Sequence, residues 1–207
     1  MNCFWQGVLR PGCPLNRNSA MRANEPGQSL LLMLDVADEL SSRNIPYAII
    51  GAIAAAVHGV VRASLDADAI VALPLSGAQR LRIDLEAAGL SSQLREGDME
   101  DPIAALLAVS DRFGNRVDLL MGLRGMDPGV FGRASLVPLS GRQLRVVGLE
   151  DFIAMKAFAS GPQDIIDARA AIAANRASID LELLRELARR FGRGAAHTVE
   201  ILLAESK

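Results

Sequence analysis

Residues 51–73 read GAIAAAVHGVVRASLDADAIVAL, and much of the fold can be predicted from this segment. Its first half is rich in small residues and predicts a helix that begins at Gly51, and its second half predicts a buried strand. On a strand, residues two apart point to the same side, so Asp66 and Asp68 project together from one face. The opposite face is predicted to pack on the core, and it carries Leu65, Ala67, Ala69, Val71 and Leu73.

The two adjacent carboxylates predict a cation site. Like charges side by side repel each other, and burial raises their pKa further unless a cation neutralises them. Mg²⁺ typically binds through one or two carboxylates together with substrate phosphates. Asp66 and Asp68 are therefore candidate ligands of Mg²⁺, with Mn²⁺ as the alternative ion.

A third carboxylate, Asp118, lies in the middle of an apolar strand predicted over residues 116–121. A carboxylate in such a strand is costly unless it faces a site. The turn residues at 111–115 predict a hairpin that joins this strand to another over residues 103–109. The alternative is that the three aspartates are surface acids that happen to align.

Four short motifs follow one another within 18 residues: Gly51-Ala52, His58-Gly59, Arg62-Ala63-Ser64 and Asp66-Ala67-Asp68. This order resembles the signature of the DNA polymerase β-like nucleotidyltransferase superfamily, in its small prokaryotic branch. That branch includes the minimal nucleotidyltransferases and the AbiEii-type toxins of toxin–antitoxin systems. The chain departs from the pattern at Ala52, where a second Gly or Ser is usual, and at Ser64, where Thr is usual.

The resemblance implies an α/β (α+β) fold, with a small mixed β-sheet core flanked by helices and followed by a C-terminal helical region. It implies a two-metal site in which Asp66 and Asp68 hold both ions and Asp118 serves the ion that activates the attacking hydroxyl. The implied reaction moves a nucleoside monophosphate from a nucleoside triphosphate to an acceptor hydroxyl, with release of pyrophosphate. RNA, a protein and a small molecule all stay open as acceptors, and a cognate antitoxin is a candidate partner.

Four positions near the paired carboxylates are candidates for binding the nucleotide. Gly51 and Ala52 are predicted at a helix N-terminus, where free N–H groups favour phosphate. The alternative there is a turn that simply requires glycine. Arg62 is a candidate contact for a phosphate or the acceptor, and Ser64 for hydrogen bonding within its loop. For His58 a packed or capping role is favoured over a catalytic one.

Lys156 is a fifth candidate for binding the nucleotide. The chain has 20 arginines but only one lysine besides Lys207. Lys156 lies in a helix predicted over residues 149–159, and the preceding Leu149-Glu150-Asp151 resembles the family's LED-x-x-x-x-K pattern. The resemblance implies that the ammonium group reaches the triphosphate as a point charge. The alternative is a lysine that extends to solvent from a helix margin.

Basic residues suggest where an RNA acceptor would bind. The hairpins between residues 112 and 145 carry six arginines, and we expect these to form a basic surface; they are Arg112, Arg116, Arg124, Arg133, Arg142 and Arg145. Arg116 shares a strand face with Asp118. A later cluster over residues 185–193 is interpreted as a solvated face.

Two sequence patterns divide the chain. Before residue 148, predicted helices alternate with predicted strands; after it, only helices are predicted. We expect a disordered leader over 1–24, a catalytic domain over 25–147 and a helical region over 148–207. The elements predicted in the catalytic domain include helices capped by Ser29 and Ser76, strands at 45–50 and 91–95, and a hairpin at 136–147.

Composition limits the class of protein. Half the residues are hydrophobic and 22% are charged, which is typical of a globular protein. No apolar run is long enough to span a membrane, and the net charge of −2 argues against a uniformly basic nucleic-acid binder. Cys3 and Cys13 lack further metal ligands and are interpreted as incidental.

The first residues raise two further questions. They lack the order of charged and apolar segments of a signal peptide, which predicts a cytoplasmic location. Translation starts at either Met1 or Met21. The alternative to an enzyme is a catalytically inactive protein of the same fold that binds a nucleotide or a protein partner.

Overall fold

The computed structural model describes residues 21–205, so both cysteines and most of the expected leader lie outside the described residues. Within the described part, the strands form one mixed sheet in the order β3-β4-β5-β2-β1-β7-β6. Neighbours β1 and β7 are parallel, as are β2 and β5, and the other neighbouring pairs are antiparallel. The strands are β1 (Tyr47–Ile49), β2 (Asp66–Val71), β3 (Ser91–Glu96), β4 (Ala105–Ser110), β5 (Arg116–Met121), β6 (Ser135–Leu139) and β7 (Arg142–Val146).

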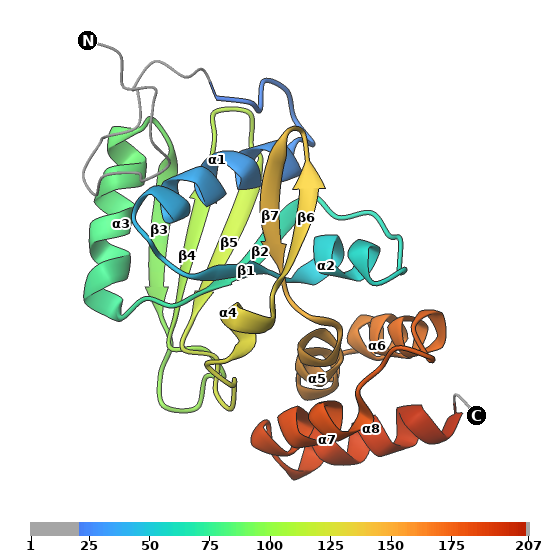
Figure 1. The fold of residues 1–207 in the computed structure, drawn as a ribbon. Coiled ribbons are helices and arrows are strands. Elements are labelled where there is room, and N and C mark those ends of the chain that lie inside the picture. The colour runs from blue at the N-terminus through green and yellow to red at the C-terminus, as the bar shows by residue number, and fades with distance from the viewer. Residues whose placement is uncertain (1–20, 206–207) are drawn as a thin grey trace, which may run out of the picture.

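Most of the described helices belong to one of two groups (Figure 1). Helices α1 and α3 lie along the sheet, whereas α5 to α8 pack on one another below the β1–β7 end. None of the described helices is long and apolar enough to cross a membrane. The helices are α1 (Ser29–Ser42), α2 (Gly51–Val57), α3 (Leu75–Ala87), α4 (Val130–Arg133), α5 (Leu149–Ala159), α6 (Pro162–Ala174), α7 (Leu181–Arg190) and α8 (Arg193–Glu205).

The sheet has one covered face and one partly open face. In β4 and β5, buried and half-buried residues alternate, as expected for strands with one face on a core. The buried positions, such as Leu107 and Leu119, belong to the core that includes residues of α1 and α3. The alternate positions, such as Ala108 and Asp118, lie on the other face. That face presents the predicted carboxylates.

Residues 21–24 are already part of the packed chain, although we expected the ordered domain to begin at residue 25. Ala23 is buried. Arg22 forms ion pairs with two carboxylates of α1, those of Asp35 and Asp38.

The two predicted serine caps are wrong. Helix α1 begins after Gln28, and Ser29 makes contacts outside the helix: its hydroxyl donates to the carbonyl of Leu65 and accepts from the backbone N–H of Arg116. Helix α3 begins directly after Pro74, before Ser76 is reached. Residue type alone suggested both caps, whereas the neighbouring strands and the proline set the actual helix starts.

Leu65 also differs from its prediction. The alternation of β2 begins only at Asp66, so Leu65 precedes the strand, and it is 84% exposed. Three of the other predicted core positions, Ala67, Ala69 and Val71, are buried as expected. Leu73 lies beyond the end of the strand and is half-buried against the core.

A buried histidine joins the sheet to the C-terminal helices. The Nε2 atom of His58 lies 2.9 Å from the carbonyl oxygen of Val147, and its ring centroid lies 5.3 Å from that of Phe152 in α5. Burial lowers the pKa of His58, so the ring stays neutral, and Nε2 carries the proton because a carbonyl can only accept. The side chain of Asn175 donates to the backbone carbonyl of His58. The interpretation of a packed histidine is therefore confirmed.

Candidate active site

Three carboxylates meet on the partly open face of the sheet. Strands β2 and β5 are parallel neighbours, and their register places Asp68 beside Asp118 and Asp66 beside Arg116. Because Asp66 and Asp68 are two residues apart, all three carboxylates lie on one face. The structure thus brings together the acids that were singled out in the sequence.

This arrangement disfavours the charged form of Asp68. Burial raises its pKa to about 6, and the nearby charges of Asp66 and Asp118 contribute to the increase. The charges of Lys156 and Arg62 lower the pKa of Asp68, so both cations are close enough to influence this carboxylate. A carboxylate with a raised pKa beside two others is stabilised by binding a cation.

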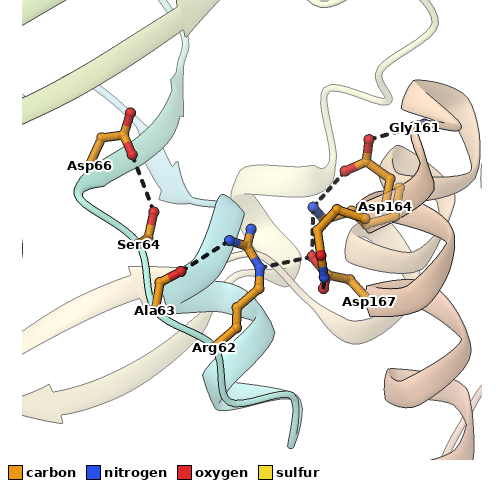
Figure 2. A network of polar contacts seen from close by, with 9 residues as sticks. Arg62, Ala63, Ser64, Asp66, Gly161, Asp164 and Asp167 are labelled. Carbon is orange, nitrogen blue, oxygen red and sulfur yellow. Dashed lines mark hydrogen bonds and ion pairs between the residues drawn. The ribbon is translucent and has the colours of Figure 1, made fainter.

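Asp118 is held by a neighbour on its own strand. Arg116 donates from Nε and Nη2 to the two oxygens of Asp118, at 2.8 and 2.7 Å. Across the site, the hydroxyl of Ser64 donates to Asp66 at 3.2 Å (Figure 2). Ser64 therefore contacts a candidate metal ligand directly.

The donor chemistry of this cluster fits Mg²⁺, because carboxylate oxygens are the ligands that this hard cation prefers. The full ligand set is nevertheless not assembled. Among the described residues, no three His, Cys, Asp or Glu side chains are gathered closely enough to hold a metal ion. Both oxygens of Asp118 face Arg116, so Asp118 has to release this arginine before it can join Asp66 and Asp68 around a cation.

Gly51 is required by its contact with Asp68. Its φ is +63°, and a Cβ at this position would lie 2.2 Å from Oδ2 of Asp68. Any side chain here would displace the carboxylate, so glycine serves the site by leaving room for it. Ala52 is buried, and its methyl group is therefore not presented on the open surface. A contact between these two residues and phosphate stays a prediction.

Lys156 does not extend into solvent. Its ammonium lies 2.7 Å from Oδ1 of Asp164 and 3.0 Å from Oδ2 of Asp167, and its side chain is only 12% exposed. The alternative of a solvent-seeking lysine at the helix margin is therefore wrong. Two carboxylates of α6 fix the position of this ammonium group.

Asp167 links Lys156 to the loop before the paired carboxylates. Its side chain is fully buried, and its Oδ2 also accepts from Nε of Arg62 at 3.2 Å (Figure 2). Burial alone would raise the pKa of Asp167. The hydrogen bonds from Gln163 and Lys156, with the charges of Lys156 and Arg62, outweigh burial and lower it. A charged Asp167 thus holds two of the predicted nucleotide contacts side by side.

Three of the six arginines expected to form a basic surface for RNA have partners in separate parts of the fold. Arg133 is committed to ion pairs with Asp127 and Asp151, and Arg142 pairs with Asp38. Arg124 donates to backbone carbonyls of the loop before β4. These arginines stabilise separate loops and elements. They were grouped by closeness in sequence, which does not bring side chains to one surface.

The fold is shared with an antibiotic-resistance factor. No family model and no curated protein matches this chain. The solution structure of ANT(2'')-Ia is similar with a TM-score of 0.56, over 86% of this chain and 98% of that chain, at 18% identity. A crystal structure of ANT(2'')-Ia in complex with adenylyl-2''-tobramycin gives 0.53, over 79% and 96%, at 22% identity. The chain therefore has the nucleotidyltransferase fold that its motifs implied.

Proposed function

We propose that this protein is a metal-dependent nucleotidyltransferase that moves a nucleoside monophosphate from a nucleoside triphosphate to an acceptor hydroxyl. One observation carries the proposal: three carboxylates on adjacent parallel strands adjoin two cations, Lys156 and Arg62, which a buried aspartate holds together. The shared fold supports the same class of reaction.

The proposed roles follow from the chemistry of each group. Asp66, Asp68 and Asp118 would hold Mg²⁺, which supplies neutralisation of phosphate charge and a clamp on the entering and leaving oxygens. Lys156 and Arg62 bind the phosphates that leave as pyrophosphate. The acceptor oxygen forms a bond to the α-phosphorus, while the bond from that phosphorus to the bridging oxygen breaks. The hydroxyl proton passes to a carboxylate of the site, and pyrophosphate takes the electron pair of the broken bond.

A second candidate is a nucleotide-binding protein that does not catalyse transfer. The bidentate contact between Arg116 and Asp118 favours it, because this contact occupies the third carboxylate. A toxin role with an antitoxin partner is supported by the sequence resemblance alone.

The test uses the purified chain with α,β-methylene-ATP for binding and labelled ATP for pyrophosphate release. We expect calorimetry to detect Mg²⁺-dependent nucleotide binding, and we expect pyrophosphate release once an acceptor is present. Asp66→Asn and Asp68→Asn should abolish both, while Glu100→Gln, a change at an exposed loop residue, should leave both intact. Binding without release across an acceptor panel would favour the inactive protein. Absence of metal-dependent binding would contradict both candidates.

A further inference from the structure

A small hollow lies on the open face of the sheet, lined in part by Ala108 and Arg116, which are neighbours of Asp118. Its volume is about 250 Å³, and it lies over strands β3, β4 and β5. The strand register runs from Asp118 to Ala108 and on to Gln93, so this row of the open face leads directly from the carboxylates into the hollow. The lining side chains that face outward are those of Ser91, Gln93, Arg95, Ala108, Ser110 and Arg116.

The charge of the hollow is positive. The described residues that line it include two arginines and no carboxylate. Arg95 donates to the amide oxygen of Gln93, a neutral partner that leaves its charge in place. Arg116 is 44% exposed even while it contacts Asp118. A ligand that lies here meets two guanidinium groups, and guanidinium groups match phosphate oxygens in geometry as well as in charge.

The size and shape of the lining also restrict the ligand. Ser91, Ala108 and Ser110 are short, so they leave room above the strands, and two of them offer hydroxyl groups for hydrogen bonds. A hollow of this volume is smaller than most ligand sites, which favours a small molecule such as a sugar phosphate.

The hollow lies on the correct side of the carboxylates for an acceptor. The sheet order places β5, β4 and β3 on one side of β2, and β1 with β7 on the other. Lys156 and Arg62 belong to the second side, because helix α5, which carries Lys156, follows β7, and Asp167 joins Arg62 to Lys156. In-line transfer requires the attacking hydroxyl and the leaving pyrophosphate on opposite sides of the α-phosphorus. The hollow and the two cations lie on opposite sides of β2, which is the arrangement that this requirement calls for.

We propose that this hollow binds the acceptor, and that the acceptor is a small hydroxylated molecule carrying a phosphate group. The proposal rests on the nucleotidyltransferase function and specifies its substrate class. Arg95 and Arg116 bind the acceptor phosphate, and a hydroxyl of the acceptor lies at Asp118. That hydroxyl loses its proton to the carboxylate of Asp118 and forms the new phosphodiester, while pyrophosphate leaves toward Lys156. A polycation such as tobramycin has the wrong charge for this surface.

The probe is ribose 5-phosphate, compared with ribose and with tobramycin. Each is titrated by calorimetry into the chain loaded with Mg²⁺ and α,β-methylene-ATP. We expect ribose 5-phosphate to bind about tenfold more tightly than ribose, because a charge-assisted contact to phosphate is lost without it. We expect tobramycin to bind no more tightly than ribose.

Three arginine variants locate the bound phosphate. Arg95→Gln and Arg116→Gln should each weaken ribose 5-phosphate binding about tenfold and leave ribose binding unchanged. Arg80→Gln makes the same charge change at an exposed position of α3, the helix that packs against β3 and β4, and should have no effect.

Four outcomes would overturn the acceptor proposal while nucleotide binding persists. They are equal binding of ribose and ribose 5-phosphate, tighter binding of tobramycin, no effect of either arginine variant, and binding of an RNA oligonucleotide in place of the sugar phosphate. If the parent chain fails to bind α,β-methylene-ATP with Mg²⁺, the function itself is wrong and the acceptor proposal is overturned with it.

Discussion

The cationic side chains on the two sides of strand β2 are held in place to different degrees. On the α5 and α6 side, Lys156 and Arg62 share a fully buried aspartate and are held in place. On the β5 to β3 side, Arg95 and Arg116 are exposed, and their partners are a neutral amide and a carboxylate of the proposed metal site. The difference indicates that the proposed phosphate side is preorganised, whereas the proposed acceptor side is left free to rearrange around a ligand.

The largest effect is expected for the carboxylates between the two sides. Asp68→Asn should lower nucleotidyl transfer by about a thousandfold, because metal clamping supplies several kcal/mol to such a transition state. The same change should raise the melting temperature of the metal-free protein, since it removes a repelled charge. Steady-state pyrophosphate release and thermal unfolding measure the two effects. Activity equal to that of the parent would contradict the assignment of Asp68.

The free energy of unfolding should also depend on pH through the carboxylate of Asp68. Between pH 4 and 6 the folded protein binds the Asp68 proton more tightly than the unfolded chain, because its folded pKa is about 6. The contribution of Asp68 to the free energy of unfolding of the metal-free protein should therefore fall as pH rises through this window, by up to about 3 kcal/mol. Urea unfolding of the parent and of Asp68→Asn isolates the effect, because the opposite contributions of other groups, such as His58 and Asp167, cancel between them. Parallel pH profiles would contradict it.

Lys156→Ala tests whether the held cations serve the nucleotide. We expect the affinity for the triphosphate to fall about ten- to a hundredfold, with little change for the nucleoside, since only the phosphates contact the ammonium. Lys156→Arg should restore the triphosphate affinity in part. Because Lys156→Ala also leaves Asp164 and Asp167 without their shared partner, unfolding has to be measured alongside. Equal losses for nucleoside and triphosphate would indicate a packing role.

The smallest effect is expected for Arg116, on the open side of β2. Here the substitution should increase an affinity, whereas the preceding substitutions decrease activity or affinity. Arg116→Gln should raise the affinity of the nucleotide-free protein for Mn²⁺ about two- to fivefold, because an exposed ion pair of modest strength no longer competes for Asp118. Titration calorimetry with Mn²⁺ measures this. Arg112→Gln, on the same hairpin, serves as the control and should behave like the parent. A weaker affinity for Mn²⁺ would show that Arg116 supports the site instead of competing for it.

The sequence was most informative where one periodicity governs several residues. The period of two placed Asp66 and Asp68 on one face, and it placed Arg116 with Asp118 as well. Helical periodicity predicted the bounds of α5 correctly, from Leu149 to Ala159. In each case the relevant neighbours lie a few residues apart, so local geometry determines which side chains share a face.

Such patterns do not predict ion pairs between residues that are far apart in the sequence. Arg62 and Asp167 are 105 residues apart, and no local rule links a loop before a strand to the middle of a later helix. Nothing in the local sequence around Asp164 and Asp167 indicates that Asp164 contacts Lys156, or that Asp167 contacts both Lys156 and Arg62. The same limitation explains the arginines at 124, 133 and 142, whose partners come from other parts of the chain.

The contact of His58 with Val147 affects whether the two parts of the chain can fold when they are expressed separately. Residue 148 marks a change of architecture, yet the groups around it are shared: the imidazole binds the backbone just before α5, and Asn175 binds the backbone of His58. A fragment ending at residue 147 would expose the imidazole and leave Arg62 without Asp167. We therefore expect the two halves, expressed separately, to remain insoluble or unfolded, and to recover nucleotide binding only when produced together.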